Sequence, residues 1–268
     1  MLAYYLPLGW FYKTRIKNFS FDNIMRIFMN YFFVVLVIVL IKAGLSAGSI
    51  ISYVVAMLCM FSVYECGYIF NDVVTVQYED KPTFRFRSYD ELKILEKHIQ
   101  NLITIRIVYF LLGILWFKNF SDYFSGDILV IVILSTFLLV AYSIHNYVRS
   151  HWNALSFFCV INFKYILPLS FFMTVKDLIL VYPVVFFANI VDQSFLTFVS
   201  KSYINLGGLV FDRDKFRAIY FFSMTLIMFV FYVMDVVCHL YVYMFVCITL
   251  YRLIGYYLTR KNFLKVDR

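Results

Sequence analysis

The stretch from Gly48 to Asp80 reads GSIISYVVAMLCMFSVYECGYIFNDVVTVQYED, and its two ends differ in polarity. Residues 48–70 form an apolar run long enough to cross roughly 30 Å of hydrocarbon as a helix. The run stops abruptly, and the carboxylates of Asp72, Glu79 and Asp80 follow. The stretch therefore predicts a transmembrane helix whose polar end gathers acidic groups.

The rest of the chain repeats the apolar half of this pattern. Of its 268 residues, 63% are hydrophobic and 15% are charged, whereas a soluble domain is expected to carry about 25% charged residues. The predicted spans are 25–43, 48–70, 99–117, 127–146, 154–174, 178–199, 217–234 and 236–258. We see no signal peptide ahead of them. The sequence predicts an all-α, polytopic transmembrane helical bundle.

The bundle is expected to be one integral membrane domain over residues 1–268. No linker rich in Gly, Pro or Ser divides the chain, and no compositional shift marks a second domain. Only Asp235 and its neighbours separate the last two spans, which predicts a tight helical hairpin. No internal repeat is obvious, so a transporter built from inverted repeats is a less favoured alternative.

The net charge is +8, and the Lys and Arg residues outside the predicted spans are concentrated on one side of them. The Lys- and Arg-bearing segments of that side are 13–26, 81–97, 149, 201–217 and 260–268, and the opposite connections hold only Lys42, Lys118 and Lys176. Cytoplasmic loops are enriched in Lys and Arg. We therefore expect an integral protein of a bacterial inner membrane, with both termini in the cytoplasm. The basic side suits a membrane face or an anionic substrate, not nucleic acid.

Glu65, Asp72 and Glu79 recur every seven residues, which is nearly two helical turns. They share one face if the second span continues helically through Glu79. Mg²⁺ binds one or two carboxylates and completes its shell with phosphates and water. The expected Mg²⁺ ligands are Asp72, Glu79, Glu65 and Asp80. The alternative is an ordinary polar helix end followed by a solvated loop.

Polar residues in other spans predict a cavity at the same membrane face. Asn153 and Lys164 are eleven residues apart, three turns on one face, and Lys164 lies too deep for a loop residue. Polar positions in the sixth span recur every four residues, at Asn189, Gln193, Thr197 and Lys201, with Asp192 alongside. The expected substrate-binding residues here are Lys81, Arg85, Tyr142, Arg149, Asn153, Asn189 and Asp192. Each alone is also compatible with hydrogen bonding between helices.

At these residues the chain resembles the UbiA superfamily of membrane prenyltransferases. That family reads NDxxDxxxD after its second span. Asn71 and Asp72 match this motif, Thr75 stands where the next Asp belongs, and Glu79 takes the place of the last. The family usually has nine spans, and this sequence shows eight.

The chain is most similar to the branch that contains decaprenyl-phosphate phosphoribosyltransferases. Lys17 and the following Asn match a Lys-Asn pair before the first span of that branch. The branch has Tyr-Ser after span four, then Asp and Arg at intervals of eleven residues. These positions are Tyr142, Asn153 and Lys164 here, and Lys201 keeps the Lys of a later KRxxE-like segment.

The resemblance implies a Mg²⁺-dependent transferase that acts on an isoprenoid (di)phosphate lipid and a small phosphorylated or aromatic co-substrate. The reaction is either prenyl transfer from a prenyl diphosphate or phosphoribosyl transfer to a polyprenyl phosphate. The implied catalytic residues are Asp72, Lys164 and Lys201, and Lys17 and Asn71 would bind substrate. The alternative is a non-catalytic UbiA-like membrane protein that binds a lipid phosphate or a partner protein. Thr75, Asn153 and Asn205 stand where the family has acidic residues, which favours that alternative.

The distribution of positive charge makes a prediction about orientation. Cysteines introduced at Ser88 and Ser202, in the two long basic loops, are expected to react with a membrane-impermeant reagent only from the cytoplasmic side. The measurement is labelling in intact cells against labelling after lysis. Labelling of both positions from the outer side would reverse the predicted orientation.

Overall fold

The computed structural model describes residues 2–16, 20–78, 85–86, 89–148, 152–200 and 212–260. The regular elements in these ranges are helices, and the ranges contain no strand, which confirms the all-α class. Seven helical segments in these ranges are long and apolar enough to cross a membrane. The chain is therefore a polytopic membrane protein with a helical architecture.

The chain divides into two compact units, Met1–Tyr182 and Pro183–Arg268, and each is described by itself. The first unit holds η1 (Leu2–Tyr5), α1 (Gly9–Arg15), α2 (Phe21–Ile27), η2 (Phe28–Phe32), α3 (Phe33–Ala43), α4 (Ala47–Val73), η3 (Thr75–Tyr78), α5 (Tyr89–Lys97), α6 (Ile99–Phe120), α7 (Ile128–Tyr147), α8 (Asn153–Leu169) and most of α9 (Val175–Val185). The second holds the end of α9, η4 (Phe186–Ile190), α10 (Val191–Ser200), α11 (Arg213–Val233) and α12 (His239–Arg260). The prediction of a single domain stays a prediction.

Each of the eight predicted spans coincides with helical structure. The seven span-length segments are Asn23–Ala43, Ala47–Tyr78, Ile99–Phe120, Ile128–Tyr147, Val175–Val199, Arg213–Val233 and His239–Leu258. The remaining predicted span, 154–174, is the apolar helix α8 of 17 residues, which rises roughly 25 Å. Turns at residues 170–172 end it early. The UbiA-like fold and the total of eight spans stay predictions.

Two spans contain a π turn. The five residues of η2 interrupt the first span, and the five residues of η4 interrupt the sixth. A π turn shifts the register of the side chains that follow it, and such turns are frequent at functional sites. Tyr31 lies in η2, and Asn189, a predicted substrate-binding residue, lies in η4.

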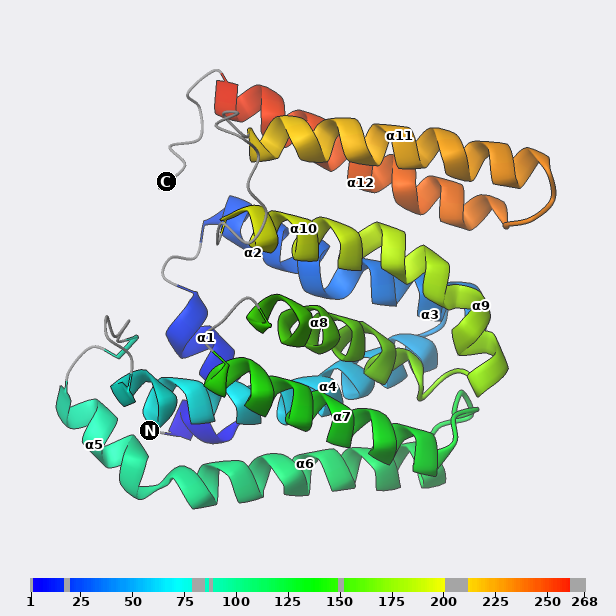
Figure 1. Cartoon of the computed structure of the whole chain (residues 1–268). Helices are drawn as coiled ribbons and strands as arrows, with labels where there is room; N and C mark the ends of the chain where they lie inside the picture. Colours follow the sequence, from blue (N-terminus) through cyan, green and yellow to red (C-terminus); the bar gives the residue numbers. More distant parts are fainter. Residues whose placement is uncertain are drawn as a thin grey trace. The chain divides into compact units, whose positions relative to one another are not determined.

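Helix α4 is the centre of the first unit and packs against α3, α6, α7 and α8 (Figure 1). Its α-helical part ends at Val73, and the 3₁₀ turn η3 follows. The hydroxyl of Thr75 donates to the backbone oxygen of Asn71 at 3.2 Å, so it satisfies a carbonyl at the helix end. The helical segment thus runs to Tyr78, but its last residues form a 3₁₀ turn, and Glu79 itself lies outside the described residues.

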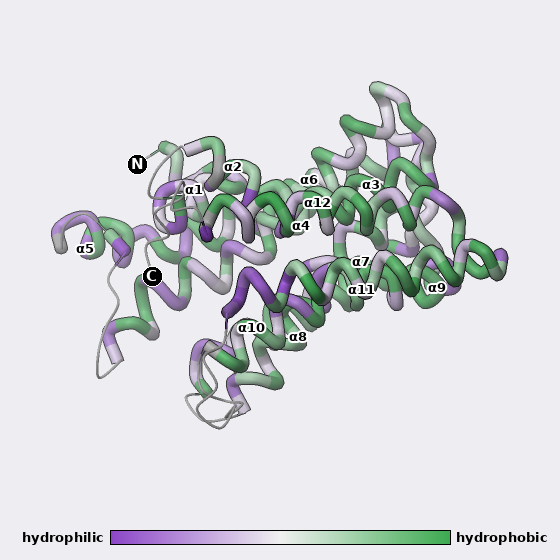
Figure 2. The backbone as a smooth tube through the Cα atoms, turned by 90° about the horizontal axis from the view of Figure 1, so that it is seen from above, coloured by the Kyte–Doolittle hydropathy of each residue, from purple (hydrophilic) through white to green (hydrophobic). Residues whose placement is uncertain are grey.

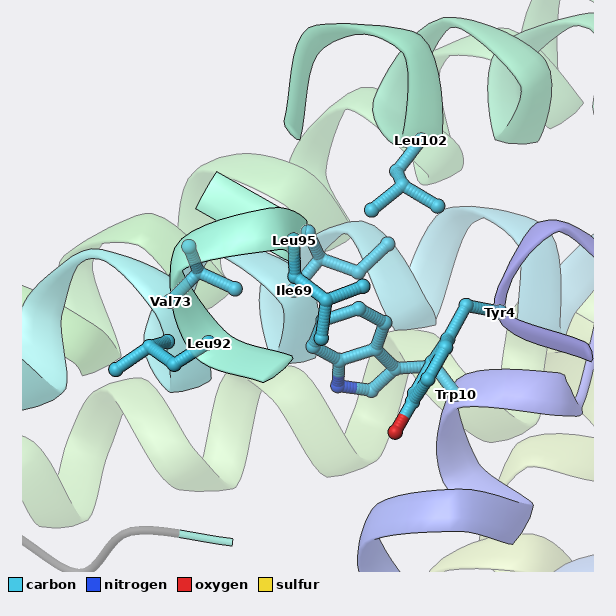
Figure 3. Packing of buried hydrophobic residues seen from close by; sticks show 7 residues of the cluster. All are labelled: Tyr4, Trp10, Ile69, Val73, Leu92, Leu95 and Leu102. Carbon is cyan, nitrogen blue, oxygen red and sulfur yellow. The ribbon is translucent and has the colours of Figure 1, made fainter. Parts of the chain in front are cut away.

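The N-terminal segment packs into the first unit through a cluster of buried apolar side chains (Figure 3). The cluster joins η1, α1, α4, α5 and α6 through Tyr4, Trp10, Ile69, Val73, Leu92, Leu95 and Leu102. Trp10 has no exposed surface. Burying an aromatic side chain of this size stabilises the fold by about 1.5–3 kcal/mol or more, so the N-terminal segment is an integral part of the unit.

A buried ion pair lies beneath this segment. Arg106 of α6 places Nη2 3.0 Å from Oε2 of Glu65 on α4, and both side chains are fully buried. The same guanidinium donates to the backbone oxygens of Tyr4 and Tyr5, at 2.9 and 2.6 Å. Arg106 therefore ties η1 to two spans of the unit.

In the second unit, α11 and α12 pack side by side, joined by a tight connection at residues 234–238. Asp235 has a φ of 57° there, a left-handed conformation that Asp tolerates better than most residues. The predicted helical hairpin is confirmed. Figure 2 shows long apolar stretches on both helices, and most of their large side chains are exposed, as expected for surfaces that face lipid.

Removal of one partner of the buried pair should destabilise the unit strongly. Arg106→Met leaves Glu65 as a buried charge without its cation, and such changes cost about 3–5 kcal/mol. Glu65→Gln combined with Arg106→Met should cost less than the two single changes added together. The measurement is the free energy of unfolding in mixed detergent micelles.

The matched control is Lys42→Met, which removes a cation from the exposed Lys42–Asp177 pair in the same unit. Little change is expected, because exposed pairs contribute little. Equal losses for Arg106→Met and Lys42→Met would contradict the role given to the buried pair.

Candidate functional site

Two carboxylates of α4 hold the two ends of the short helix α1. Glu65 accepts a hydrogen bond of 2.7 Å from the backbone N–H of Phe11, and two further N–H groups at the start of α1 face it. Asp72, seven residues later, binds Arg15, the last residue of α1. Seven residues rise about 10 Å in either helix. The spacing of the two acids therefore matches the length of α1.

Asp72 is buried and accepts from several donors at once. Arg15 donates Nη1 to Oδ2 at 2.9 Å and Nη2 to Oδ1 at 3.0 Å, the bidentate geometry in which Arg and carboxylate pair most strongly. Trp10 donates Nε1 to Oδ2 at 3.0 Å, and Asn71 donates Nδ2 to Oδ1 at 3.2 Å. Nε of Arg85 lies 3.7 Å from Oδ1. Both oxygens of the predicted metal ligand are thus occupied by N–H groups.

Arg15 is held in place by a charge and by an aromatic face. Burial alone lowers the pKa of Arg15, but the attraction of Asp72 and the hydrogen bonds between them outweigh it and keep that pKa above its ordinary value. The guanidinium carbon lies 4.2 Å from the ring centroid of Tyr68, within cation–π distance. Arg15 is therefore a charged, oriented group beside the interior of the helix bundle.

Tyr68 belongs to a group that we call the tyrosine cluster, contributed by η2, α4, α7 and α8: Tyr31, Tyr64, Tyr68, Tyr142 and Tyr165. The rings of Tyr64, Tyr68 and Tyr142 meet edge to face, with centroids 4.9 to 5.6 Å apart. The hydroxyls of Tyr64 and Tyr68 are 3.1 Å apart, and Tyr31 also hydrogen-bonds to Tyr68. These contacts form a continuous aromatic and hydroxyl-bearing path inside the first unit.

Lys164 of α8 lies at the far end of this path. It is 2% exposed, and its Nζ lies 4.2 Å from the ring centroid of Tyr31, 4.4 Å from that of Tyr165 and 6.0 Å from that of Tyr64. Aromatic faces attract a desolvated ammonium by about 2 kcal/mol or more. The sequence placed Lys164 at depth, facing a polar interior, and the structure brings it to the tyrosine cluster. Contacts thus run from Asp72 through Arg15, Tyr68 and Tyr31 to Lys164.

The remaining predicted residues of α7 and α8 serve the packing of these helices. Asn153 donates to the backbone oxygens of His145 and Val148, at 3.0 and 2.5 Å, and so links the start of α8 to the end of α7. Tyr142 packs on Gly67, where an added Cβ would lie 2.2 Å from the Tyr142 ring. The absence of a side chain at Gly67 is what lets this ring enter the cluster.

Asn189 and Asp192 belong to the second unit. Both are buried. Asp192 accepts from Nε of Arg217 at 3.0 and 3.2 Å, and Nη2 of Arg252 lies 3.5 Å from Oδ2. This cluster ties α10 to α11 and α12.

The described carboxylates do not fit a magnesium site as they are arranged. Glu65 faces Arg106 and backbone N–H groups, and Asp72 faces Arg15 and Trp10. The described residues contain no group of three His, Cys, Asp or Glu side chains suited to a metal ion. The predicted site residues Lys17, Glu79, Asp80, Lys81, Arg149 and Lys201 lie outside the described residues. The magnesium prediction stays a prediction.

Sequence reasoning missed Trp10, Arg15 and Arg106. Arg106 had a readable signal: Glu65 and Arg106 are single opposite charges inside two predicted spans, and charges at membrane depth pair with one another. Trp10 and Arg15 lie in a helix of seven residues, which is too short to produce a clear periodic pattern. Their partners become visible only when α1 is placed on α4.

The close approach at Gly67 leads to a test of the tyrosine cluster. Gly67→Ala should destabilise the first unit by about 1–3 kcal/mol, because the new methyl group displaces the Tyr142 ring. Gly67→Ala with Tyr142→Ala should lose less than the sum of the single changes. The control is Gly255→Ala, where an added Cβ meets nothing within 4 Å. Additive losses measured by detergent unfolding would contradict the contact.

Comparison of the chain with protein-family models, curated proteins and solved structures finds no match. The resemblance to the UbiA superfamily therefore stays a prediction from the motif residues.

Proposed function

We propose that this chain is a membrane transferase that acts on an isoprenoid lipid. Its reaction is either prenyl transfer from a prenyl diphosphate to an acceptor or phosphoribosyl transfer to a polyprenyl phosphate. Both reactions use a lipid whose polar end carries phosphate. The site must therefore combine positive charge with an apolar, membrane-embedded surface, and must lie where a bundle of membrane helices ends.

The observation that carries the proposal is Lys164, buried among tyrosine rings and joined through them to Arg15 and Asp72. An ionisable side chain inside a membrane bundle is costly and usually marks a substrate or ion path. Among the residues that the structure describes, three basic side chains, Lys164, Arg15 and Arg85, lie along this path together with the carboxylate of Asp72. The excess favours an anionic ligand.

The tyrosine cluster fits the other half of such a ligand. Its rings offer apolar faces, while the hydroxyls of Tyr64 and Tyr68 provide hydrogen-bonding groups close by. A phosphate end would pair with the cations and the first isoprene units would contact the rings. In the transfer step, the acceptor forms a bond to the donor's carbon while the bond from that carbon to the phosphate oxygen breaks. The nearby cations would stabilise the negative charge that collects on the leaving group.

We assign the chain to the bacterial inner membrane with both termini cytoplasmic. The Lys and Arg excess of the two long loops and of the terminal segments supports this orientation. A phosphorylated donor from the cytoplasm then reaches the basic side of the bundle directly.

A non-catalytic role in binding a lipid phosphate is the second candidate. The bidentate pair between Arg15 and Asp72 favours it, because it occupies both oxygens of the acid that the family motif uses for metal. Thr75 adds to this, since it caps a carbonyl of α4 in place of a third carboxylate. Substrate turnover separates the two candidates.

The test uses the full chain in lipid nanodiscs and measures binding of farnesyl diphosphate, phosphoribosyl diphosphate and farnesol. Lys164→Met should keep the fold, because it removes a desolvated charge, and should weaken binding of the phosphorylated ligand about tenfold to a hundredfold. Lys164→Arg should retain part of that affinity. Lys118→Met, at the far end of α6, is the control.

Release of diphosphate in the presence of candidate acceptors would establish the transferase, and tight binding without turnover would favour the second candidate. Mass spectrometry of the lipids that accumulate when the gene is removed would identify the substrate. If Lys164→Met folds and binds farnesyl diphosphate as tightly as the parent protein, the site proposed here is wrong.

A further inference from the structure

More N–H groups surround Asp72 than its carboxylate can accept hydrogen bonds from with good geometry. Five N–H-bearing groups converge on it: Nη1 and Nη2 of Arg15, Nε1 of Trp10, Nδ2 of Asn71 and Nε of Arg85. A carboxylate offers about four lone-pair positions. Arg85, at 3.7 Å, is the group left outside hydrogen-bond distance. Among the described residues, Arg85 is thus the cation that Asp72 does not hydrogen-bond.

Among Asp72, Arg15 and Arg85, the solvent-accessible side chains are the positively charged ones. The side chain of Asp72 is 2% exposed, that of Arg15 is 13% exposed and that of Arg85 is 36% exposed. Two guanidinium groups thus lie over one buried carboxylate, and these three described side chains together carry one positive charge. A guanidinium presents five N–H donors in a planar fork that matches phosphate as well as carboxylate. The outer ligand of such a group is expected to be an anion with several oxygens.

We propose that Arg15 and Arg85 form a binding site for a phosphate or diphosphate group, in which Asp72 is the resident anion that the ligand competes with. The ligand takes over N–H groups that now point at Asp72, because a phosphate group offers three oxygens and up to two negative charges where the carboxylate offers two oxygens and one. Tyr68 keeps the Arg15 guanidinium in place during the exchange. This proposal rests on the proposed function, because both require a phosphorylated ligand. It adds which residues bind the phosphate.

In this arrangement, the loss of Asp72 changes the affinity for phosphate in the opposite direction to the loss of a metal ligand. A metal ligand at Asp72 helps to bind phosphate, so its loss weakens binding. A resident anion repels the phosphate and occupies its donors, so its loss strengthens binding. It also leaves Arg15 as a buried guanidinium in need of an anion, which adds to the affinity. The sign of the change in Asp72→Asn therefore separates the two roles.

The first experiment measures binding of inorganic pyrophosphate and of farnesyl diphosphate to the full chain in nanodiscs of zwitterionic lipid, with EDTA present. Arg15→Gln and Arg85→Gln should each weaken binding about tenfold to a hundredfold, since each removes hydrogen bonds to a charged group. Lys13→Gln is the matched control, because it removes a positive charge from α1 at a residue exposed to solvent. It should leave the affinity within about threefold of the parent value.

The second experiment compares Asp72→Asn with the parent protein under the same conditions. We expect about tenfold tighter binding of pyrophosphate, and a larger rise in thermal stability on adding pyrophosphate than the parent shows. Weaker binding by Asp72→Asn, together with a gain in affinity that only the parent protein shows when excess Mg²⁺ replaces EDTA, would overturn the proposal and assign Asp72 to metal. If Asp72→Asn does not fold, Arg85→Gln still tests the two-arginine site, because Arg85 is the most exposed member and contributes least to packing.

The two ligands distinguish the source of the phosphate. Equal affinities that both fall in Arg15→Gln assign the site to a free phosphate or diphosphate. Tighter binding of farnesyl diphosphate, with the same loss in Arg15→Gln, assigns it to a lipid phosphate. If farnesyl diphosphate binds but neither arginine variant changes its affinity, the two-arginine site is wrong and the proposed function stands. If neither ligand binds, both proposals fail.

Discussion

Pairing of charges inside apolar helices is the constraint on which the first unit depends. A carboxylate or guanidinium transferred alone from water into such an interior costs several kcal/mol, and attraction to a partner has to offset most of that cost. Glu65 meets this requirement through Arg106 and through backbone N–H groups of α1. Asp72 meets it through Arg15 and Trp10. Lys164 meets it in another way, through the faces of tyrosine rings.

These pairs also explain how a short helix holds its place. A helix of seven residues is marginal in water because its nucleation is unfavourable. The acid at its beginning suits the positive end of the helix dipole, and the acid at its end captures a cationic side chain. Trp10 adds the apolar contact between them. Charge and burial together therefore select one direction and one register for α1 along α4.

Most of the fold could be predicted from hydropathy, because long apolar runs have few alternatives to membrane helices. Lys164 could be placed in the interior for the same reason, since a cation inside a span has to snorkel or face a polar cavity, whereas its contacts with tyrosine rings could not be predicted. The shared helix face of Glu65 and Asp72 was also predictable from their spacing. What occupies that face was not: the motif suggested a metal ion, whereas a preceding helix supplies Arg15 and Trp10. Hydropathy does not indicate which segments, distant in sequence, pack against one another.

The partners of the N-terminal segment lie far along the chain, and this has a consequence for biogenesis. Phe11 binds a residue 54 positions later, and Tyr4 and Tyr5 bind one more than 100 positions later. Protein synthesis proceeds from the N-terminus, so η1 and α1 emerge long before α4 and α6 exist. The amide of Phe11 must therefore wait for the second span before it meets Glu65, and the carbonyls of Tyr4 and Tyr5 must wait for the third span before they meet Arg106. Asp72, the partner of Trp10 and Arg15, arrives with the second span, so the pairing of these two side chains can precede the contacts to Arg106.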